Sequence, residues 1–350
     1  MLLVRSTGRQ RRRTVLVATM GALLTACCGS QGTRSSRLAV DLEVVGATGS
    51  PGSAEVARRA LADASSDLEV RCAAWLALGR IGAREGTLAE ALEWLARVGR
   101  ECASLPRTSS EALWEVASIT ARLHPGSEQE VLERVASWFP DQPAAARAVR
   151  ELAAKARGSE EVRRTVARLR ELHRRTEGRE VAPVILWEAA RLLAAEPAEA
   201  YRLEALGLYR LLARRYPRSG LRDDALWAAG NLALELGDPR EALECFVDLR
   251  GLREWSFLFG SYERPLYQEA LRGMARAFLG LGRHREASRA LEILARERPR
   301  QARDLLEEAA SIREDGGDPD GAAVLRKQAS ESHRHHRPMQ EPAQSPDPGP

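Results

Sequence analysis

Lysine is nearly missing from this chain, because only Lys155 and Lys327 occur and 51 of the 53 basic residues are therefore arginine. Such a bias is typical of a genome-wide codon preference, and we infer no function from it. The formal net charge is +4, but the first 26 residues hold five arginines and no acid, and removing those five charges leaves −1. The rest of the chain has no basic excess, which argues against nucleic acid as a partner.

Motifs of catalytic chemistry are also missing. The chain contains no GxxxxGK[ST], HExxH, GxSxG or CxxC, the patterns of phosphate, zinc-protease, hydrolase and metal or redox sites. Three imidazoles lie in SHRHHR (332–337) between arginines, and those arginines disfavour a cation. We therefore predict no catalytic residues, no cofactor and no metal.

Cysteine is scarce, with five residues in all. Cys72, Cys102 and Cys245 are far apart, and their spacing does not choose a disulfide pair. We interpret them as three buried, small apolar side chains. An oxidising compartment would still allow one pair to form a bridge.

The other two cysteines follow an apolar run near the N-terminus. Five arginines are followed by the apolar stretch TVLVATMGALLT (14–25), of signal-peptide length, and then by Leu24-Thr25-Ala26-Cys27. This order resembles the lipobox of bacterial lipoproteins. The resemblance implies a signal peptide over residues 1–26, a lipid such as palmitate on Cys27, and outer-membrane sorting, because Cys28 replaces the aspartate that favours inner-membrane retention. The alternative is an ordinary cleavable signal with an incidental cysteine.

Composition divides the remaining chain. Residues 27–53 are rich in Gly, Ser and Thr, which predicts a flexible tether from the lipid. Residues 328–350 hold five prolines and few apolar side chains, which predicts a disordered tail. Between them, Leu, Ala and Trp recur every three or four residues, so we predict an all-α body with disordered termini.

Four short blocks repeat within this body. GTLAEA (86–91), GDPREA (237–242), GRHREA (282–287) and GDPDGA (317–322) each place a glycine five residues before an alanine. The glycine can end one helix in a left-handed cap, and Asp or Thr can cap the next helix. The alanine then lets two helices approach closely. Each block is predicted to be the elbow of a helical hairpin.

The spacing resembles the tetratricopeptide repeat, which has a period of about 34 residues. One unit over 226–246 has Leu226, Ala229, Gly230 and Ala233, followed by Ala242 and Phe246; similar units cover 186–217 and 271–299. The resemblance implies an α-solenoid, with TPR-like repeats over 181–327. The half over 54–180 is less regular, although its stretch 61–79 resembles a single HEAT repeat.

One stretch resembles a narrower family. ALGLYRLLARRYPRSGLRDDALWAAGNLALELGDPREALECF (205–246) is similar to the hairpins of BamD-type lipoproteins, which help to assemble outer-membrane barrels. The resemblance implies a periplasmic protein of the cell envelope that binds protein or peptide partners.

An insertion at 251–265 interrupts the repeat spacing and is rich in aromatic side chains. We predict that Trp255, Phe257, Phe259 and Tyr262 anchor a partner, because aromatic side chains dominate many interfaces. The alternative is that they form local core.

These observations predict a non-catalytic, lipid-anchored scaffold at the periplasmic face of the outer membrane, in barrel assembly, pilus biogenesis or cell-wall synthesis. The alternative is a peptidoglycan-active enzyme or its helical accessory domain, because soluble lytic transglycosylases also carry a helical superhelix. The oligomeric state does not follow from the sequence.

Overall fold

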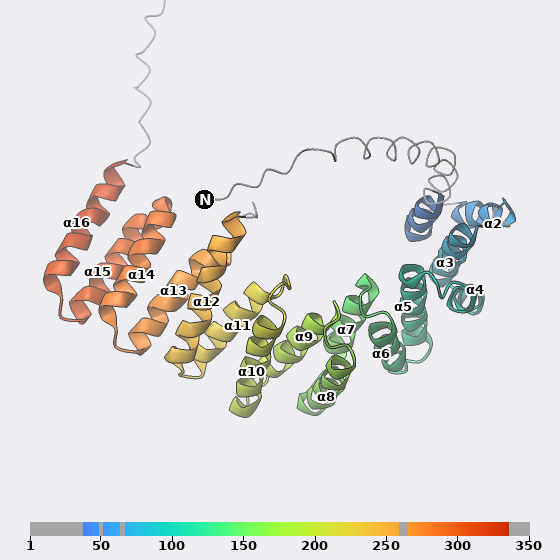
Figure 1. The fold of residues 1–350 in the computed structure, drawn as a ribbon, viewed down its shortest axis with the longest axis horizontal. Helices are drawn as coiled ribbons and strands as arrows, with labels where there is room; N and C mark the ends of the chain where they lie inside the picture. Colours follow the sequence, from blue (N-terminus) through green and yellow to red (C-terminus); the bar gives the residue numbers. More distant parts are fainter. Residues whose placement is uncertain (1–37, 49–51, 64–66, 259–264, 336–350) are drawn as a thin grey trace, which may run out of the picture. The chain divides into compact units, whose positions relative to one another are not determined.

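The structure is a computed structural model that describes residues 38–48, 52–63, 67–258 and 265–335. The described residues contain helices and connecting turns and no strand, which confirms the predicted all-α class. The chain forms two compact units, one ending at Leu152 and one beginning at Ala153. We describe each unit by itself (Figure 1).

The first unit contains a helix over residues 38–48 and then α2 (Ser53–Asp63), α3 (Leu68–Glu85), α4 (Leu88–Glu101), α5 (Pro106–Leu123), α6 (Glu128–Trp138) and most of α7 (Pro143–Lys155). Consecutive helices from α2 to α6 pack on one another, and α3 also contacts α5. A chain of small apolar clusters forms the core, with alanine and leucine as its main side chains.

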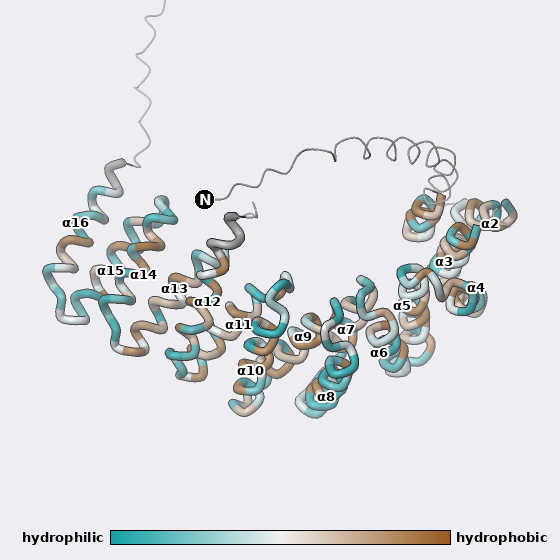
Figure 2. Tube along the Cα trace, in the orientation of Figure 1, coloured by the Kyte–Doolittle hydropathy of each residue, from teal (hydrophilic) through white to brown (hydrophobic). Residues whose placement is uncertain are grey.

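The second unit contains α8 (Ser159–Arg175), α9 (Ala182–Ala194), α10 (Glu199–Arg215), α11 (Arg222–Glu235), α12 (Pro239–Leu258), α13 (Pro265–Gly280), α14 (His284–Glu297), a short 3-10 turn (Pro299–Gln301), α15 (Ala302–Asp315) and α16 (Pro319–His335). Each helix packs on the next one along the chain. Hydrophilic and hydrophobic residues alternate along these helices, as expected when one stripe of each faces its neighbours (Figure 2). The unit is a stack of tandem helical hairpins, as the repeat spacing predicts.

The four predicted elbows are confirmed. Their glycines all adopt a left-handed backbone, with φ between 70° and 89°, and their alanines are all fully buried. Asp238 and Asp318 cap the helices that follow, since their carboxylates accept the backbone N–H of Glu241 and Gly321, each at 3.0 Å. Thr87 makes no such cap; its hydroxyl donates to the carbonyl of Gly82 instead.

Ion pairs join alternate helices of the second unit. Arg170 of α8 pairs with Glu204 of α10, and Arg210 of α10 pairs with Glu244 of α12. The chain therefore contacts itself again two helices further on, as in a stack of helical hairpins.

Two segment boundaries predicted from composition differ from the structure. Residues 38–48 belong to the predicted tether, yet they form a helix whose Ala39 and Leu42 are buried against α2 and α3. The predicted tail begins at 328, yet α16 continues to His335 and buries Ala329 completely. Composition failed in both places because one or two apolar residues at helical spacing are enough to pack a helix against an existing core. Residues 27–37, 49–51 and 336–350 of these two segments lie outside the described ranges.

The cysteine interpretation is also wrong for two of the three residues. Cys72 and Cys102 form a disulfide with Cα atoms 6.0 Å apart, whereas Cys245 is a buried free thiol. Cys72 lies near the start of α3 and Cys102 follows the end of α4. Because antiparallel hairpin helices bring the start of one beside the end of the other, the two sulfur atoms meet.

Candidate functional site

The residues predicted from sequence to bind a lipid or a partner lie largely outside the described structure. Cys27 precedes it, and Phe259 and Tyr262 fall in the gap after Leu258. The backbone of Trp255 and Phe257 belongs to α12, which extends into the predicted insertion, but their side chains lie outside the described atoms. These roles stay predictions.

A further aromatic residue, two positions after the insertion, is part of the core. Tyr267 of α13 is 3% exposed, and its hydroxyl donates to the Asp223 carboxylate of α11 at 2.8 Å. The carbonyl of Tyr267 accepts from Arg250 of α12, which also pairs with Glu297 of α14. Tyr267 therefore ties neighbouring hairpins together, and for this residue packing is the correct reading.

A pocket of about 510 Å³ lies between α14, α15 and α16. Its floor is apolar and comes from Ala295, Ala302 and Leu306. Its rim is polar and includes Arg296 of α14 and Gln328 of α16. A pocket of a few hundred cubic ångströms with an apolar floor and a few polar groups suits a side chain or short segment of a ligand.

The acidic side of this pocket is held in place by neighbouring charges. Glu292 accepts from Arg313 of α15 at 3.3 Å and from the Ser288 hydroxyl at 3.3 Å. Arg313 also donates to Asp318 at 2.8 Å, and this hydrogen bond keeps the pKa of the Asp318 carboxyl below its usual value. Glu292 is thus engaged within the protein, while Arg296 is exposed at the rim. The pocket fits an apolar side chain with a polar or acidic group beside it.

A second, wider cleft of about 1120 Å³ lies between the α8–α9 and α10–α11 loops. At one side His173 Nε2 and the Tyr216 hydroxyl are 2.8 Å apart, and Glu177 accepts from Arg215 at 2.8 Å. Burial lowers the pKa of His173, which favours the neutral ring. The Tyr216 hydroxyl oxygen also accepts from the backbone N–H of Gly178. The cleft is open and has both polar and apolar side chains in its lining, and these contacts join its two loops.

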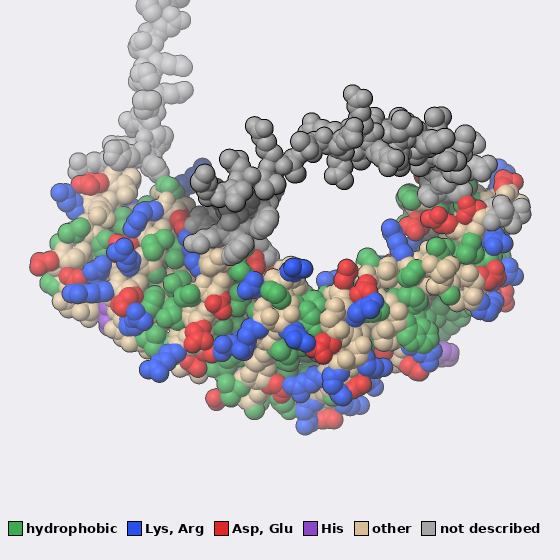
Figure 3. All heavy atoms as spheres, viewed as in Figure 1, with side chains coloured by type: hydrophobic (Ala, Val, Ile, Leu, Met, Phe, Trp, Pro, Cys, Tyr) green, Lys and Arg blue, Asp and Glu red, His purple; other side chains and the backbone are tan. Residues whose placement is uncertain are grey.

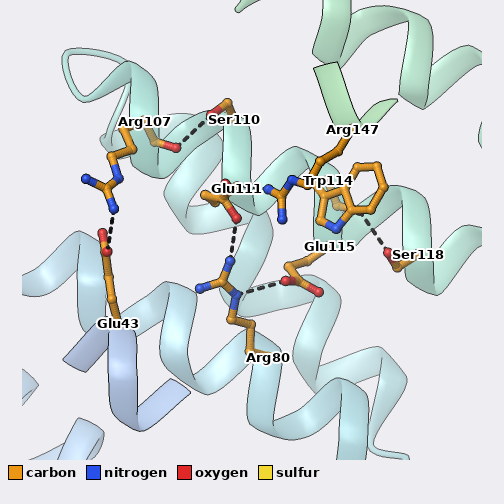
Figure 4. A network of polar contacts seen from close by, with 9 residues as sticks. All are labelled: Glu43, Arg80, Arg107, Ser110, Glu111, Trp114, Glu115, Ser118 and Arg147. Carbon is orange, nitrogen blue, oxygen red and sulfur yellow. Dashed lines mark hydrogen bonds and ion pairs between the residues drawn. The ribbon is translucent and has the colours of Figure 1, made fainter. Parts of the chain in front are cut away.

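A polar network lies on one face of the first unit (Figure 4). Arg80 of α3 donates to Glu111 at 2.6 Å and to Glu115 at 2.8 Å, both on α5. Arg147 of α7 also pairs with Glu111, and its guanidinium lies 4.9 Å from the centroid of the Trp114 ring. The charges neutralise one another inside the network. This arrangement joins three helices and leaves little free charge for a ligand.

Neither the pocket nor the network was predicted from sequence. Gln328 lies in the predicted tail, and the pocket residues carry no motif. A signal was present, because Ala322, Leu325 and Ala329 continue a helical period through residue 328 and all three are buried. The described residues include no group of three or more His, Cys, Asp or Glu side chains placed to hold a metal ion. Among them, no helix has the length and apolarity needed to cross a bilayer.

No protein-family model and no curated protein matches the chain. Two solved structures among those that match are a circular tandem repeat protein with novel repeat topology and enhanced subunit contact surfaces, and a computationally designed self-assembling cyclic homooligomer. The first is 17% identical to this chain, has a TM-score of 0.16, and its alignment covers 89% of this chain and 74% of the other. The second is 19% identical, has a TM-score of 0.13, and its alignment covers 85% of this chain and 98% of the other. At these TM-scores the two likenesses carry no argument about function. The tandem hairpins and glycine elbows of the structure itself define the class: this chain is an all-α helical-repeat protein.

Proposed function

We propose that this protein is a non-catalytic scaffold of the bacterial cell envelope, held at the membrane by a lipid on Cys27. It binds a protein or peptide partner in the periplasm. The pocket between α14, α15 and α16 carries the proposal, since it combines an apolar floor with an exposed arginine at its rim. Helical-repeat proteins commonly use such grooves for helices or extended segments.

The disulfide supports the proposed compartment. A bridge between Cys72 and Cys102 persists in an oxidising environment such as the periplasm and is rare in the cytosol. The N-terminal charge run, apolar run and cysteine independently favour export and lipidation.

Envelope assembly is the proposed setting because of the stretch 205–246. Its residues span most of α10 and the whole of α11, and reach Phe246 in α12. Their resemblance to BamD-type lipoproteins favours outer-membrane assembly over pilus or cell-wall machinery. Figure 3 shows Lys and Arg interspersed with Asp and Glu on the visible face, which suits a protein partner more than a polyanion.

Photo-crosslinking in native membranes tests the partner site. Benzoylphenylalanine replaces Gln328 at the pocket rim, and in a control it replaces Ser330, which is exposed on the same helix and does not line the pocket. We expect a defined protein adduct from position 328 and a much weaker one from position 330. Equal adducts at both positions, or none at 328, would contradict the proposed site.

A charge reversal sharpens this test. Arg296→Glu, at the rim, is expected to lower the adduct yield at position 328 severalfold, since a rim charge guides partner docking. Arg303→Glu reverses an exposed charge on α15 that does not line the pocket and should leave the yield unchanged. Both substitutions are on the surface, so melting temperatures should match that of the unsubstituted protein.

The anchor has its own test. Cys27→Ala removes the thiol that would carry the lipid, so we expect palmitate labelling to disappear and the lipid-anchored form to be lost. Palmitate that still enters the Cys27→Ala protein would refute the anchor while leaving the pocket proposal intact.

A further inference from the structure

The helix over residues 38–48 presents an uncovered apolar face. One side of this helix is core, with Ala39 6% and Leu42 1% exposed. The opposite side carries Val40 and Val44, which are 58% and 55% exposed. These valines are four residues apart, so they lie one above the other on a single face. Solvent exposure of two neighbouring β-branched apolar side chains calls for an explanation.

Exposed apolar side chains are concentrated in this part of the chain. Among the described residues, eleven large apolar side chains are exposed, and four of them fall within residues 38–56: Leu38, Val40, Val44 and Val56. Single exposed apolar residues are ordinary on protein surfaces. Val40 and Val44 differ from such single residues because they share one face of a helix, which marks a contact surface.

The position of this surface relative to Cys27 indicates what covers it. Cys27 and Leu38 are eleven positions apart. A fully extended chain covers about 3.3–3.6 Å per residue, so Leu38 lies within about 40 Å of the anchored cysteine. A lipid on Cys27 therefore keeps this helix beside the bilayer, whereas a soluble partner or a second copy would have to reach it there.

The neighbouring charges define the depth of contact. Asp41 is exposed on the same helix, while Glu43 is paired with Arg107 of α5 at 3.3 Å. Arg58 and Arg59 are exposed on α2, where Arg59 also pairs with Glu55 at 3.0 Å. An exposed carboxylate is tolerated among hydrated headgroups and costly in hydrocarbon, and arginines favour anionic headgroups.

We propose that the face formed by Val40 and Val44 rests on the lipid surface that holds the anchor, at the depth of the headgroups. This contact holds the first unit against the membrane. The inference rests on the proposed lipidation of Cys27 and adds a second, non-covalent attachment to it.

Photo-crosslinking to lipid tests the contact on the full-length protein in native membranes. Benzoylphenylalanine replaces Val44, and in a matched control it replaces Leu123, which is 44% exposed. Leu123 is the last residue of α5, about 24 Å along that helix from the Arg107 that touches Glu43. Mass spectrometry of the adducts identifies the crosslinked molecule. We expect phospholipid adducts from position 44 at a yield well above that from position 123.

The other outcomes overturn the inference. Equal lipid yields at 44 and 123 show that the apolar face has no preference for the bilayer. An adduct to a second copy of the chain, or to another protein, shows that a protein covers the face. Palmitate labelling of the same samples separates the two proposals: a lipidated protein without lipid adducts at 44 refutes only the contact, whereas a protein without lipid refutes the anchor and the contact together.

Discussion

Breaking the disulfide between Cys72 and Cys102 should destabilise the first unit by several kcal/mol. The bond joins α3 to the residue that follows α4, and both cysteines are fully buried. Two routes break it: chemical reduction, and the double substitution Cys72→Ala with Cys102→Ala. Alanine is preferred to serine because an added hydroxyl would be buried without an assured partner.

The magnitude follows from the length of the closed loop. The two cysteines are 30 positions apart, and for a loop of that length the chain-entropy expression gives about 3.6 kcal/mol at 25 °C. A domain of roughly 100 residues shifts its Tm by several degrees per kcal/mol, so we expect a decrease on the order of 10–20 °C. Only the transition of the first unit should move, because the bridge lies entirely within it.

Tryptophan fluorescence during urea unfolding reports on this unit. It contains four of the seven tryptophans: Trp75, Trp94, Trp114 and Trp138. The control is Cys245→Ala, which removes a buried free thiol from the second unit. Burial raises the pKa of Cys245 to about 12, so its thiol stays protonated and takes little part in disulfide exchange. Reductant should destabilise the unsubstituted protein and Cys245→Ala equally and leave the double alanine variant unchanged.

Two results would refute this reasoning. If mass spectrometry of the exported protein finds Cys72 and Cys102 as free thiols, the bridge is wrong. If the bridge is present and reductant leaves the first transition in place, then loop closure contributes no stability here. A reductant effect that persists in the double alanine variant would place the sensitive bond elsewhere.

Two further predictions concern the second unit. An added Cβ on Gly230 would lie 2.7 Å from the ring of buried Phe246, so Gly230→Ala should lower the free energy of urea unfolding by about 1–3 kcal/mol. Gly207→Ala is the control: no atom lies within 4 Å of its added Cβ, and it should raise that free energy by about 0.5–1 kcal/mol. Equal stabilities of the two variants would contradict the packing. Burial lowers the pKa of His173 below its usual 6.5, so the unfolded chain binds a proton at this ring more readily than the folded protein does. The contribution of the neutral His173 ring to stability is therefore full above pH 6.5 and falls as the pH drops through the folded-state pKa. His173→Gln should therefore lose less stability between pH 7 and pH 5 than the unsubstituted protein does; identical pH slopes for the two proteins would be the opposing result.

The sequence by itself determined the helical hairpins of this protein. Each elbow needs a glycine that reaches positive φ and, five residues later, a side chain small enough for close helix contact. Both requirements act within a few residues, so the four blocks from 86 to 322 could be recognised without a structure. The resemblance to a repeat of about 34 residues rested on the same local spacing.

The disulfide was within reach of sequence reasoning and was missed. Cys72 and Cys102 are equally distant from Thr87, at the elbow between α3 and α4, so an antiparallel hairpin must bring them side by side. Applying the predicted elbow to the cysteines would have selected this pair and left Cys245 free, as the structure has it.

Only the tertiary structure decided which weakly patterned segments join the fold and where pockets open. Residues 38–48 and 328–335 are poor in strong signals, and they are helical because α2, α3, α14 and α15 already offer a surface for Leu42 and Ala329. The pocket beside Arg296 depends on how far apart α14 and α16 are held by α15. Such distances result from the packing of side chains that are remote in sequence, and no local spacing encodes them.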